Sequence, residues 1–191
     1  DINRIYIHGL SNGGRGTWDT ATKRPDLFAA ALPMSGLPYN SDISAERLET
    51  TPIRLYQGGT DTNPSPGGSV SMINKLVANG GNPQYILYPT LGHGVWNQAY
   101  SEPDFWSWML SKNKLNIYIF GGGTELCPGA TNTKKLGFSY GYTSYQWKKD
   151  GIVIPGETTR YLTITGVGSY TGSYTVDFTR PNGTSGTSNP V

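Results

Sequence analysis

The stretch "IYIHGLSNGGRGTWD", residues 5–19, decides the expected fold of the first part of the chain. It opens with β-branched and aromatic residues, and a single serine, Ser11, then stands among glycines. A short apolar run of this kind is typical of a buried parallel strand. The residues after the glycines are compatible with a helix, with Trp18 and Ala21 on one face and Pro25 after its end. The stretch therefore predicts a strand, a sharp turn at Ser11 and a helix from residue 13 to about residue 24.

Ser11 lies within a pattern that is typical of reactive serines. The residues Gly9-Leu10-Ser11-Asn12-Gly13 fit the G-x-S-x-G nucleophile elbow, which requires a strand before it and a helix after it. A serine on such a strained turn needs neighbours without a Cβ, because a side chain two positions away collides with the turn. Glycine-rich turns are common in many folds, so the pattern alone leaves a purely structural role open.

A serine hydroxyl attacks poorly at neutral pH unless a positioned imidazole takes its proton. The chain has two histidines. His8 lies within the predicted strand three residues before Ser11, so its side chain cannot easily fold back onto the serine and a packing or supporting role is favoured. His93 lies in "YPTLGHGVWNQAY", after a strand predicted at residues 84–88. A loop at the carboxyl end of a parallel strand presents its residues at the active edge of the sheet.

The imidazole needs a carboxylate to fix its tautomer, and Asp61 is the favoured candidate. Asp61 lies in "YQGGTDTNP", beyond a strand predicted at residues 52–59. A lone aspartate in a turn is more often a turn former or helix cap. The order Ser11, Asp61, His93 is nevertheless that of one class of serine hydrolase triads and differs from the other orders. Asp42 and Asp104 are poorer candidates, because one follows an earlier strand and the other lies in a predicted helix.

The chain changes character near residue 113. Before it, strands at 27–36, 52–59 and 84–88 alternate with helices at about 68–80 and 97–111, which predicts a parallel sheet covered by helices. After it, short runs of Tyr, Thr, Val and Ile are broken by Gly, Asn and Ser without a helical period. This pattern is typical of an antiparallel sandwich. We therefore expect an α/β domain over residues 1–113 and an all-β domain over residues 114–191, with the boundary at about Lys112 to Leu115.

Composition excludes several classes of protein. The net charge of +2 is too small to imply a nucleic-acid partner or a membrane surface. No apolar run approaches the roughly 18 residues of a membrane span, and the first residues lack the features of a signal peptide. The single cysteine, Cys127, excludes an internal disulfide and a Cys-rich zinc site. Because the chain begins inside a predicted strand, we expect a processed or truncated piece of something longer.

Residues 3–111 resemble the C-terminal half of secreted α/β-hydrolase esterases, the phospholipase/carboxylesterase-like and polyhydroxybutyrate-depolymerase-like group. The resemblance rests on the serine elbow, the "GGTD" turn that ends at Asp61 and the "GHGVW" loop around His93. It implies Ser11 as nucleophile, Asp61 as acid and His93 as base, with the Asn12 amide as an oxyanion donor. Trp96 resembles the tryptophan that follows the catalytic histidine and is a candidate for the substrate pocket, although simple core packing stays open. No cofactor or metal is expected.

The sequence departs from this group in one respect. Such a fold has strands and helices before the nucleophile strand, including the loop that donates the second oxyanion amide, and this chain contains none of them. The resemblance therefore implies a partner, the missing N-terminal half of the hydrolase domain, and we expect the catalytic setting of Ser11 to be incomplete in this chain alone.

The second half resembles the immunoglobulin-like modules of secreted bacterial enzymes. In "YQWKKDG", residues 145–151, Trp147 would face inward, and in "GSYTGSYTVDF", residues 168–178, Tyr174 stands where a tyrosine corner would lie. Val176 occupies the place of the cysteine found in antibody-type domains. Among the tyrosines expected at the surface, Tyr140, Tyr142 and Tyr170 are candidates for stacking on sugar rings. Ordinary packing and a spacer role are the favoured alternative.

Two functional classes follow from these patterns. The first is a secreted or cell-surface serine hydrolase that cleaves carboxylic esters through an acyl-enzyme, on acylated polysaccharide or polyester, with an immunoglobulin-like accessory module. The second is a secreted binding or adhesion protein whose hydrolase half is a non-catalytic remnant. A peptidase of the prolyl-oligopeptidase type shares the triad order and is a further alternative within the first class.

Overall fold

The computed structural model of the chain describes residues 1–191, which divide into two compact units, Asp1–Lys114 and Leu115–Val191. The first unit alternates strands and helices along the chain, and the second contains strands alone. Each unit has its own buried apolar core. No helix in either unit has the length and apolar character needed to cross a bilayer.

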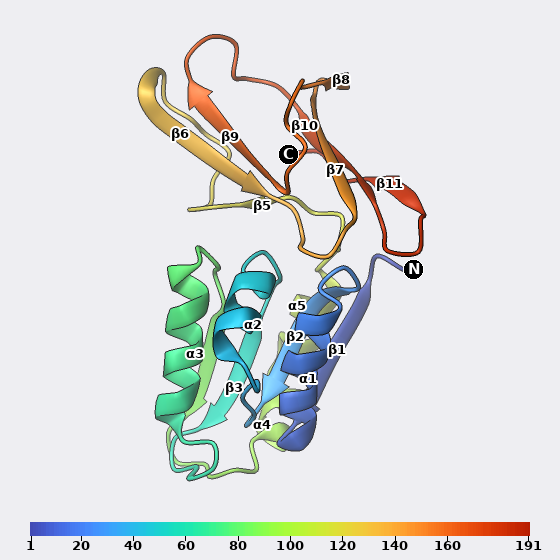
Figure 1. The fold of residues 1–191 in the computed structure, drawn as a ribbon. Helices are drawn as coiled ribbons and strands as arrows, with labels where there is room; N and C mark the ends of the chain where they lie inside the picture. The colour runs from blue at the N-terminus through green and yellow to red at the C-terminus, as the bar shows by residue number, and fades with distance from the viewer. The chain divides into compact units, whose positions relative to one another are not determined.

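The first unit is built on a four-stranded parallel sheet with the strand order β1-β2-β3-β4 (Figure 1). Each strand is followed by a helical segment, as parallel pairing requires. The strands are β1 (Ile5–Leu10), β2 (Phe28–Met34), β3 (Arg54–Gly58) and β4 (Gln84–Tyr88). The helices are α1 (Asn12–Lys23), α2 (Ser41–Leu48), α3 (Pro66–Ala78), α4 (Trp96–Ser101) and α5 (Phe105–Leu110).

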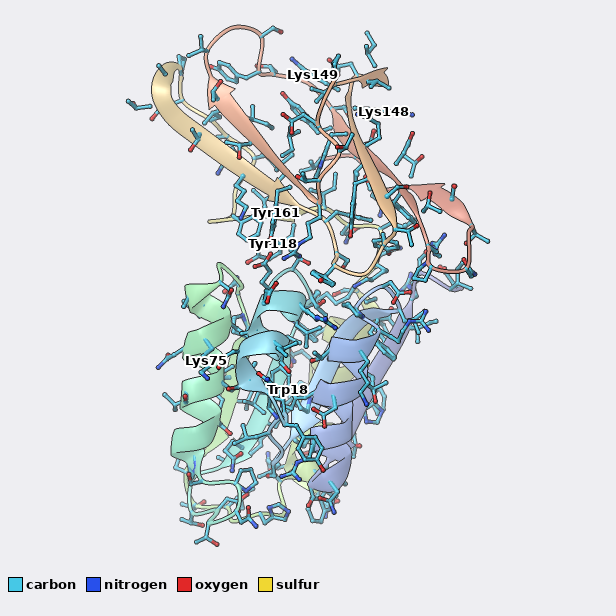
Figure 2. All side chains as sticks on the ribbon, viewed as in Figure 1. Trp18, Lys75, Tyr118, Lys148, Lys149 and Tyr161 are labelled. Atoms are coloured by element: carbon cyan, nitrogen blue, oxygen red, sulfur yellow. The ribbon has the colours of Figure 1, made fainter.

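Helices cover both faces of this sheet, so the two central strands are buried along their whole length. On one face, Trp18 and Ala21 of α1 are fully buried with side chains from α2 and α3, and Figure 2 shows Trp18 at this face. On the other face, Phe105 of α5 packs with Ala99 of α4 against the sheet. The Ala-rich β2 allows the helices to approach closely, because its side chains are small.

Two expectations about the first unit differ from the structure, and one helix was not expected at all. β1 is the edge strand and its side chains are half or fully exposed, so the strand predicted to be buried is not. The single helix expected over 97–111 is two helices, because Pro103 lacks an amide hydrogen and its ring disfavours a helical conformation in the residue before it. An unexpected helix, α2, begins after Asn40, whose side chain accepts a hydrogen bond from the Ile43 amide at 3.1 Å.

The second unit contains antiparallel strands in two sheets, with the strand orders β11-β10-β7-β8 and β5-β6-β9 (Figure 1). Its strands are β5 (Tyr118–Ile119), β6 (Gly129–Gly137), β7 (Ser144–Lys149), β8 (Ile152–Val153), β9 (Tyr161–Gly166), β10 (Tyr174–Thr179) and β11 (Ser185–Thr187). Trp147 and Val176 are fully buried and lie opposite each other in the register of β7 and β10.

The tyrosines of the second unit are only partly where they were expected. Tyr142 is 7% exposed, because its ring packs against Phe138 and Phe178 in the core, so its prediction as a surface residue is wrong. Tyr140 is half-buried beneath the Arg160 guanidinium, and Tyr170 is half-buried at the wall of a cavity.

Lys114, at the end of the first unit, is buried and gives that unit a pH-dependent stability. Its ammonium donates to the Phe28 carbonyl at 3.0 Å. Burial, opposed in part by Asp26, lowers the pKa of Lys114 to about 7. The unfolded chain therefore binds a proton that the folded chain lacks between that pKa and the ordinary lysine value, so the free energy of unfolding rises with pH across this window.

We expect the Lys114→Met variant to lose this dependence. Between about pH 7 and about pH 9 the wild-type free energy of unfolding should rise by roughly 2 kcal/mol relative to that of Lys114→Met. Urea unfolding of both proteins at several pH values measures the difference, with exposed Lys135 changed to Met as the control. Parallel pH profiles for wild type and Lys114→Met would contradict it.

Candidate active site

Ser11 occupies a strained turn between β1 and α1. Its backbone has φ 56° and ψ −119°, a conformation that residues with a side chain rarely adopt. The Ser11 amide donates to the Met34 carbonyl of β2 at 2.9 Å, and its own carbonyl accepts from the Arg15 amide at 3.0 Å. Its hydroxyl makes no capping hydrogen bond to α1. The turn is thus fixed through its backbone, while the side chain is left for other chemistry.

Close backbone contacts explain the glycines of this turn. A Cβ on Gly9 would lie 2.5 Å from the Gly13 carbonyl oxygen, and one on Gly14 would lie 2.5 Å from the Met34 carbonyl oxygen. A Cβ on Gly36, after β2, would come within 2.7 Å of the Ser11 carbonyl oxygen. Gly13 differs from its prediction, because a Cβ there meets nothing within 4 Å. The turn needs glycine before the serine and at Gly14, where α1 passes over β2.

Asn12 is the first residue of α1. The earliest backbone hydrogen bond of this helix runs from Arg15 to Ser11, so the amides of Asn12 and the two glycines after it have no partner within the helix. Such amides, at the positive end of the helix, stabilise negative charge. The Asn12 amide follows directly after the Ser11 side chain, which suits it to an oxyanion that forms on an atom bonded to the serine.

His93 and Asp61 are joined by a hydrogen bond. His93 Nδ1 lies 2.9 Å from Asp61 Oδ2, across 32 residues of sequence. Asp61 follows β3 in the chain, and its side chain is 3% exposed. His93 follows β4, and its side chain is 40% exposed. An ionised carboxylate only accepts hydrogen bonds, so in the neutral imidazole Nδ1 carries the proton and the other nitrogen, Nε2, is left as an acceptor. A histidine in this state can take a proton from a hydroxyl group.

Three donors hold the Asp61 carboxylate. Besides His93, the Asn63 amide donates to Oδ1 at 2.9 Å and Gln57 Nε2 donates to Oδ2 at 3.1 Å. Gln57 is fully buried, and its carbonyl oxygen accepts a hydrogen bond from Ser69 of α3 at 2.8 Å. Burial disfavours the charged carboxylate, but the hydrogen bonds from Asn63, His93 and Gln57 outweigh it, so the pKa of Asp61 is lowered. The carboxylate is therefore charged at neutral pH.

The loops that carry Asp61 and His93 are packed backbone against backbone. A Cβ on Gly58 would lie 1.9 Å from the Gly92 carbonyl oxygen, and one on Gly59 would lie 2.5 Å from the Pro89 carbonyl oxygen. The Thr60 amide donates to the Leu91 carbonyl at 3.0 Å. This contact fixes the two loops relative to each other and thereby fixes the Asp61–His93 pair.

Ser11, Asp61 and His93 follow three strands of one parallel sheet at their carboxyl ends, the edge at which sites of α/β proteins form. Within this arrangement the structure joins Asp61 to His93, whereas Ser11 makes no hydrogen bond to the His93 ring. Trp96, at the start of α4, packs over Gly94 and against the core beside the sheet, and it is half-buried.

The other candidate residues lie outside this set. His8 is exposed on β1, where its ring meets Tyr100 and Phe105 edge to face. Asp104 forms a bidentate ion pair with Arg54. Asp42 forms an ion pair with Lys75, which extends from α3 in Figure 2. No cluster of three or more histidine, cysteine, aspartate or glutamate side chains that could hold a metal ion occurs in the chain.

Comparisons with known proteins find a depolymerase and two solved structures that are similar to part of the chain. Poly(3-hydroxyalkanoate) depolymerase C of Paucimonas lemoignei is 31% identical to the chain over 88 residues, which are 46% of this chain and 20% of that protein. The crystal structure of a thermostable esterase superposes with a TM-score of 0.55 and 32% identity, over 59% of this chain and 32% of the other. SOBER1 of Arabidopsis thaliana has 26% identity and a TM-score of 0.45, over 51% of this chain and 49% of that one. No family model matches the chain.

The similarity to the thermostable esterase shows an α/β-hydrolase-like fold, with a parallel sheet and flanking helices. The chain spans about a fifth of the length of the depolymerase and about a third of the length of the esterase.

Proposed function

We propose that the first unit carries the catalytic residues of a serine hydrolase that cleaves carboxylic esters. The observation that carries this proposal is the His93–Asp61 hydrogen bond at the sheet edge where Ser11 sits on its strained turn. In the proposed site Ser11 is the nucleophile, His93 the base and Asp61 the acid. The similarity to a depolymerase and an esterase supports an ester substrate.

The proposed reaction has two steps. The Ser11 oxygen attacks the ester carbonyl carbon while Nε2 of His93 takes the hydroxyl proton, and the negative carbonyl oxygen receives a hydrogen bond from the Asn12 amide. The intermediate collapses to an acyl-serine as His93 returns the proton to the departing alcohol. Water then attacks the acyl group by the same route, which releases the acid and restores Ser11. Asp61 holds the His93 tautomer and stabilises the imidazolium that forms.

Two further parts of the proposal concern the substrate. Trp96 lies three residues after His93, at the start of α4, and is proposed to line the substrate pocket from its half-buried position. The depolymerase similarity favours a polyester, and an acyl group on polysaccharide is a second ester class of the same chemistry. Hydrolysis of 4-nitrophenyl butyrate, with no cleavage of peptide 4-nitroanilides, tests esterase against peptidase activity; the reverse pattern would contradict the ester assignment.

We also infer that a further segment completes the sheet beside β1. One edge of β1 has no partner strand, and Ile5 and Leu10 on it are each 37% exposed. An apolar strand edge of this kind favours pairing with another strand. Such a segment is proposed to supply a second hydrogen-bond donor to the oxyanion, beside the Asn12 amide.

For the second unit we propose an immunoglobulin-like module on an exported or cell-surface protein. Two buried features support the module. Trp147 donates from its indole nitrogen to the Thr159 carbonyl at 2.9 Å, and the Tyr174 hydroxyl donates to the carbonyl of Tyr170, four residues upstream, at 2.6 Å. The second contact has the form of a tyrosine corner.

Gln57 is proposed as the positioning residue for Asp61, and the Gln57→Met variant tests this role. Because a hydrogen bond to a charged group contributes about 1.5–3 kcal/mol, we expect kcat to fall by roughly 10- to 100-fold with little change in KM. Gln57 stabilises the charged carboxylate, so its loss raises the pKa of Asp61.

Two matched variants separate this role from general damage to the fold. Ser69→Ala removes only the group that holds the Gln57 carbonyl oxygen, so it should give a smaller change in the same direction. Gln84→Met changes a glutamine at the start of β4, which pairs with Arg54, and should leave kcat unchanged. A wild-type kcat in Gln57→Met would reduce Gln57 to a packing residue.

A further inference from the structure

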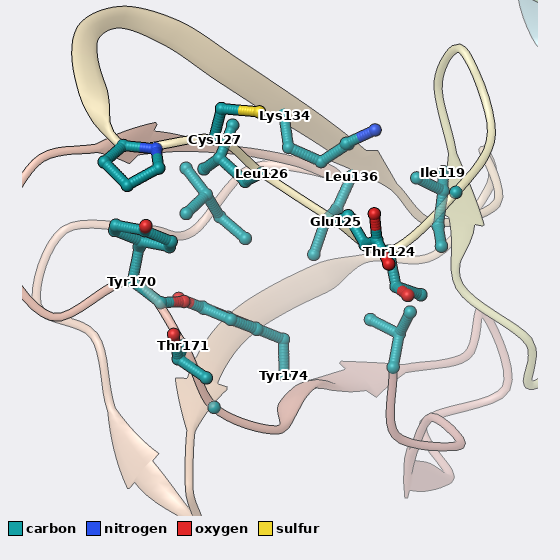
Figure 3. Close-up of a pocket in the computed structure, with 15 residues that line it drawn as sticks. Ile119, Thr124, Glu125, Leu126, Cys127, Lys134, Leu136, Tyr170, Thr171 and Tyr174 are labelled. Carbon is teal, nitrogen blue, oxygen red and sulfur yellow. The ribbon is translucent and has the colours of Figure 1, made fainter.

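The second unit contains a cavity that the proposed hydrolase chemistry does not use. Its volume is about 560 Å³, within the range of small-molecule sites. Figure 3 shows it between the segment that precedes β6 and the segment that joins β9 to β10. Every lining residue belongs to the second unit, so this site is separate from Ser11, Asp61 and His93.

The walls of the cavity are mainly apolar and continue the core of the unit. Tyr170 and Tyr174 face Leu126 and Leu136 across the opening (Figure 3). Leu136 and Tyr174 are 3% and 7% exposed, so these two walls are part of the buried core. The lining also includes three half-buried aliphatic side chains, namely Ile119, Ile164 and Val191. Apolar walls of this kind favour a ligand with a hydrocarbon body, because its burial removes apolar surface from water.

Hydrogen bonds hold the cavity open in this shape. The Tyr174 hydroxyl donates to the Tyr170 carbonyl at 2.6 Å, and the backbones of Tyr174 and Val191 exchange hydrogen bonds of 2.9 and 3.0 Å. On the other side, Lys134 Nζ donates to the Gly122 carbonyl at 2.8 Å. A preformed cavity binds its ligand without the cost of ordering the walls.

The charged side chains of the lining determine which polar group on a ligand is favoured. Lys134 is its one cation and keeps donors in addition to the one used by Gly122, since an ammonium has three. Glu125, its one anion, is exposed. The Tyr174 hydroxyl is already engaged with the Tyr170 carbonyl, so Lys134 is the charged donor that a ligand can reach.

We propose that this cavity binds an aliphatic carboxylate, with the hydrocarbon chain between the Tyr174 and Leu136 walls and the carboxylate at Lys134. The proposal stands on the second unit alone and does not depend on the proposed hydrolase activity.

The test is a titration of chain 1–191 with dodecanoate below its micelle concentration, followed by NMR chemical shifts. We expect saturable shifts confined to the residues around the cavity. Leu126→Trp fills the cavity and should weaken binding by roughly 10-fold or more. Val167→Trp adds the same ring at a position that is 59% exposed and outside the lining, and should leave binding unchanged.

Lys134→Gln tests the polar end without altering the apolar walls. It should weaken dodecanoate binding by about 10-fold while leaving the binding of dodecanol unchanged, because only the carboxylate uses the ammonium. Saturable binding that Leu126→Trp does not weaken, an equal loss for both ligands in Lys134→Gln, or no saturable binding at all would overturn the proposal.

Discussion

Replacing Ser11 or His93 with alanine is expected to lower kcat/KM for 4-nitrophenyl butyrate by roughly 10⁴-fold or more. Without Ser11 no acyl-enzyme forms, and without His93 nothing removes the hydroxyl proton as the bond forms. The groups act as a unit, so the double variant Ser11→Ala, His93→Ala should be little worse than either single variant. Steady-state rates measured by nitrophenolate release give the comparison.

The assay needs the full-length protein and a control variant of a histidine outside the proposed site. Because the chain spans about a third of the esterase it resembles, the assay should use the protein with any sequence that precedes Asp1 in its gene. His8→Ala is the matched control, since His8 lies on β1 with Tyr100 and outside the Asp61 pair. A Ser11→Ala protein with wild-type turnover would remove the serine from the mechanism.

Gly58→Ala is expected to have the second largest effect, through geometry alone. Its Cβ would lie 1.9 Å from the Gly92 carbonyl oxygen and 2.6 Å from that of Leu91, so the β3 end and the His93 loop must separate. A shift of about 1 Å in a catalytic pair can lower turnover by about 100-fold, and overpacking of this kind costs about 1–3 kcal/mol of stability. We expect both effects, measured as kcat and as the urea midpoint.

Gly92→Ala supplies the control on the opposite side of the same contact. A Cβ there meets only Thr60 Oγ1, at 3.8 Å, which is an ordinary contact. This variant should keep the urea midpoint of the wild type. If Gly58→Ala also keeps the wild-type midpoint and turnover, the close packing of the two loops is not what holds His93 against Asp61.

The alternation of strands and helices in the first unit could be predicted, because periodicity reports local burial. The strand at 84–88 is found with its predicted bounds, and Trp18 and Ala21 are buried on one face of α1 as expected. The edge position of β1 could not be predicted, because an apolar run does not say which strands lie beside it. The start of α2 is indicated in the sequence by Asn40, because asparagine is a common N-cap residue. The rest of that segment has the composition of a loop, so the helix was not predicted.

The candidate site was predictable only for residues whose chemistry is local in sequence. Ser11 stands in a recognisable pattern, and Asp61 and His93 each follow a predicted strand. Gln57 was missed because the sequence shows it only as one residue of a predicted strand. Its orientation depends on a hydrogen bond from Ser69 of α3, twelve residues away in the chain. The need for glycine at Gly58 was missed for the same reason, since the carbonyl it meets lies far along the chain.

The second unit shows the same limit in its tyrosines. Tyr142 lies in a stretch rich in glycine, threonine and serine, which favours exposure, yet it is buried against Phe138 and Phe178. Alternation along one strand cannot identify such a contact, because Phe138 directly follows β6 of one sheet and Phe178 lies in β10 of the other. Trp147, whose large apolar ring favours burial in any arrangement, was placed correctly in the core.

The most direct test of the central claim is the reaction of the protein with a fluorophosphonate, followed by peptide mass spectrometry. An activated serine attacks phosphorus, displaces fluoride and retains the phosphonyl group, whereas an ordinary surface serine does not react. We expect one adduct, on Ser11, and its loss in the His93→Ala variant although the serine is still present. A folded protein that hydrolyses 4-nitrophenyl butyrate with Ser11 unmodified, or an adduct on Ser11 that forms equally fast without His93, would contradict the account.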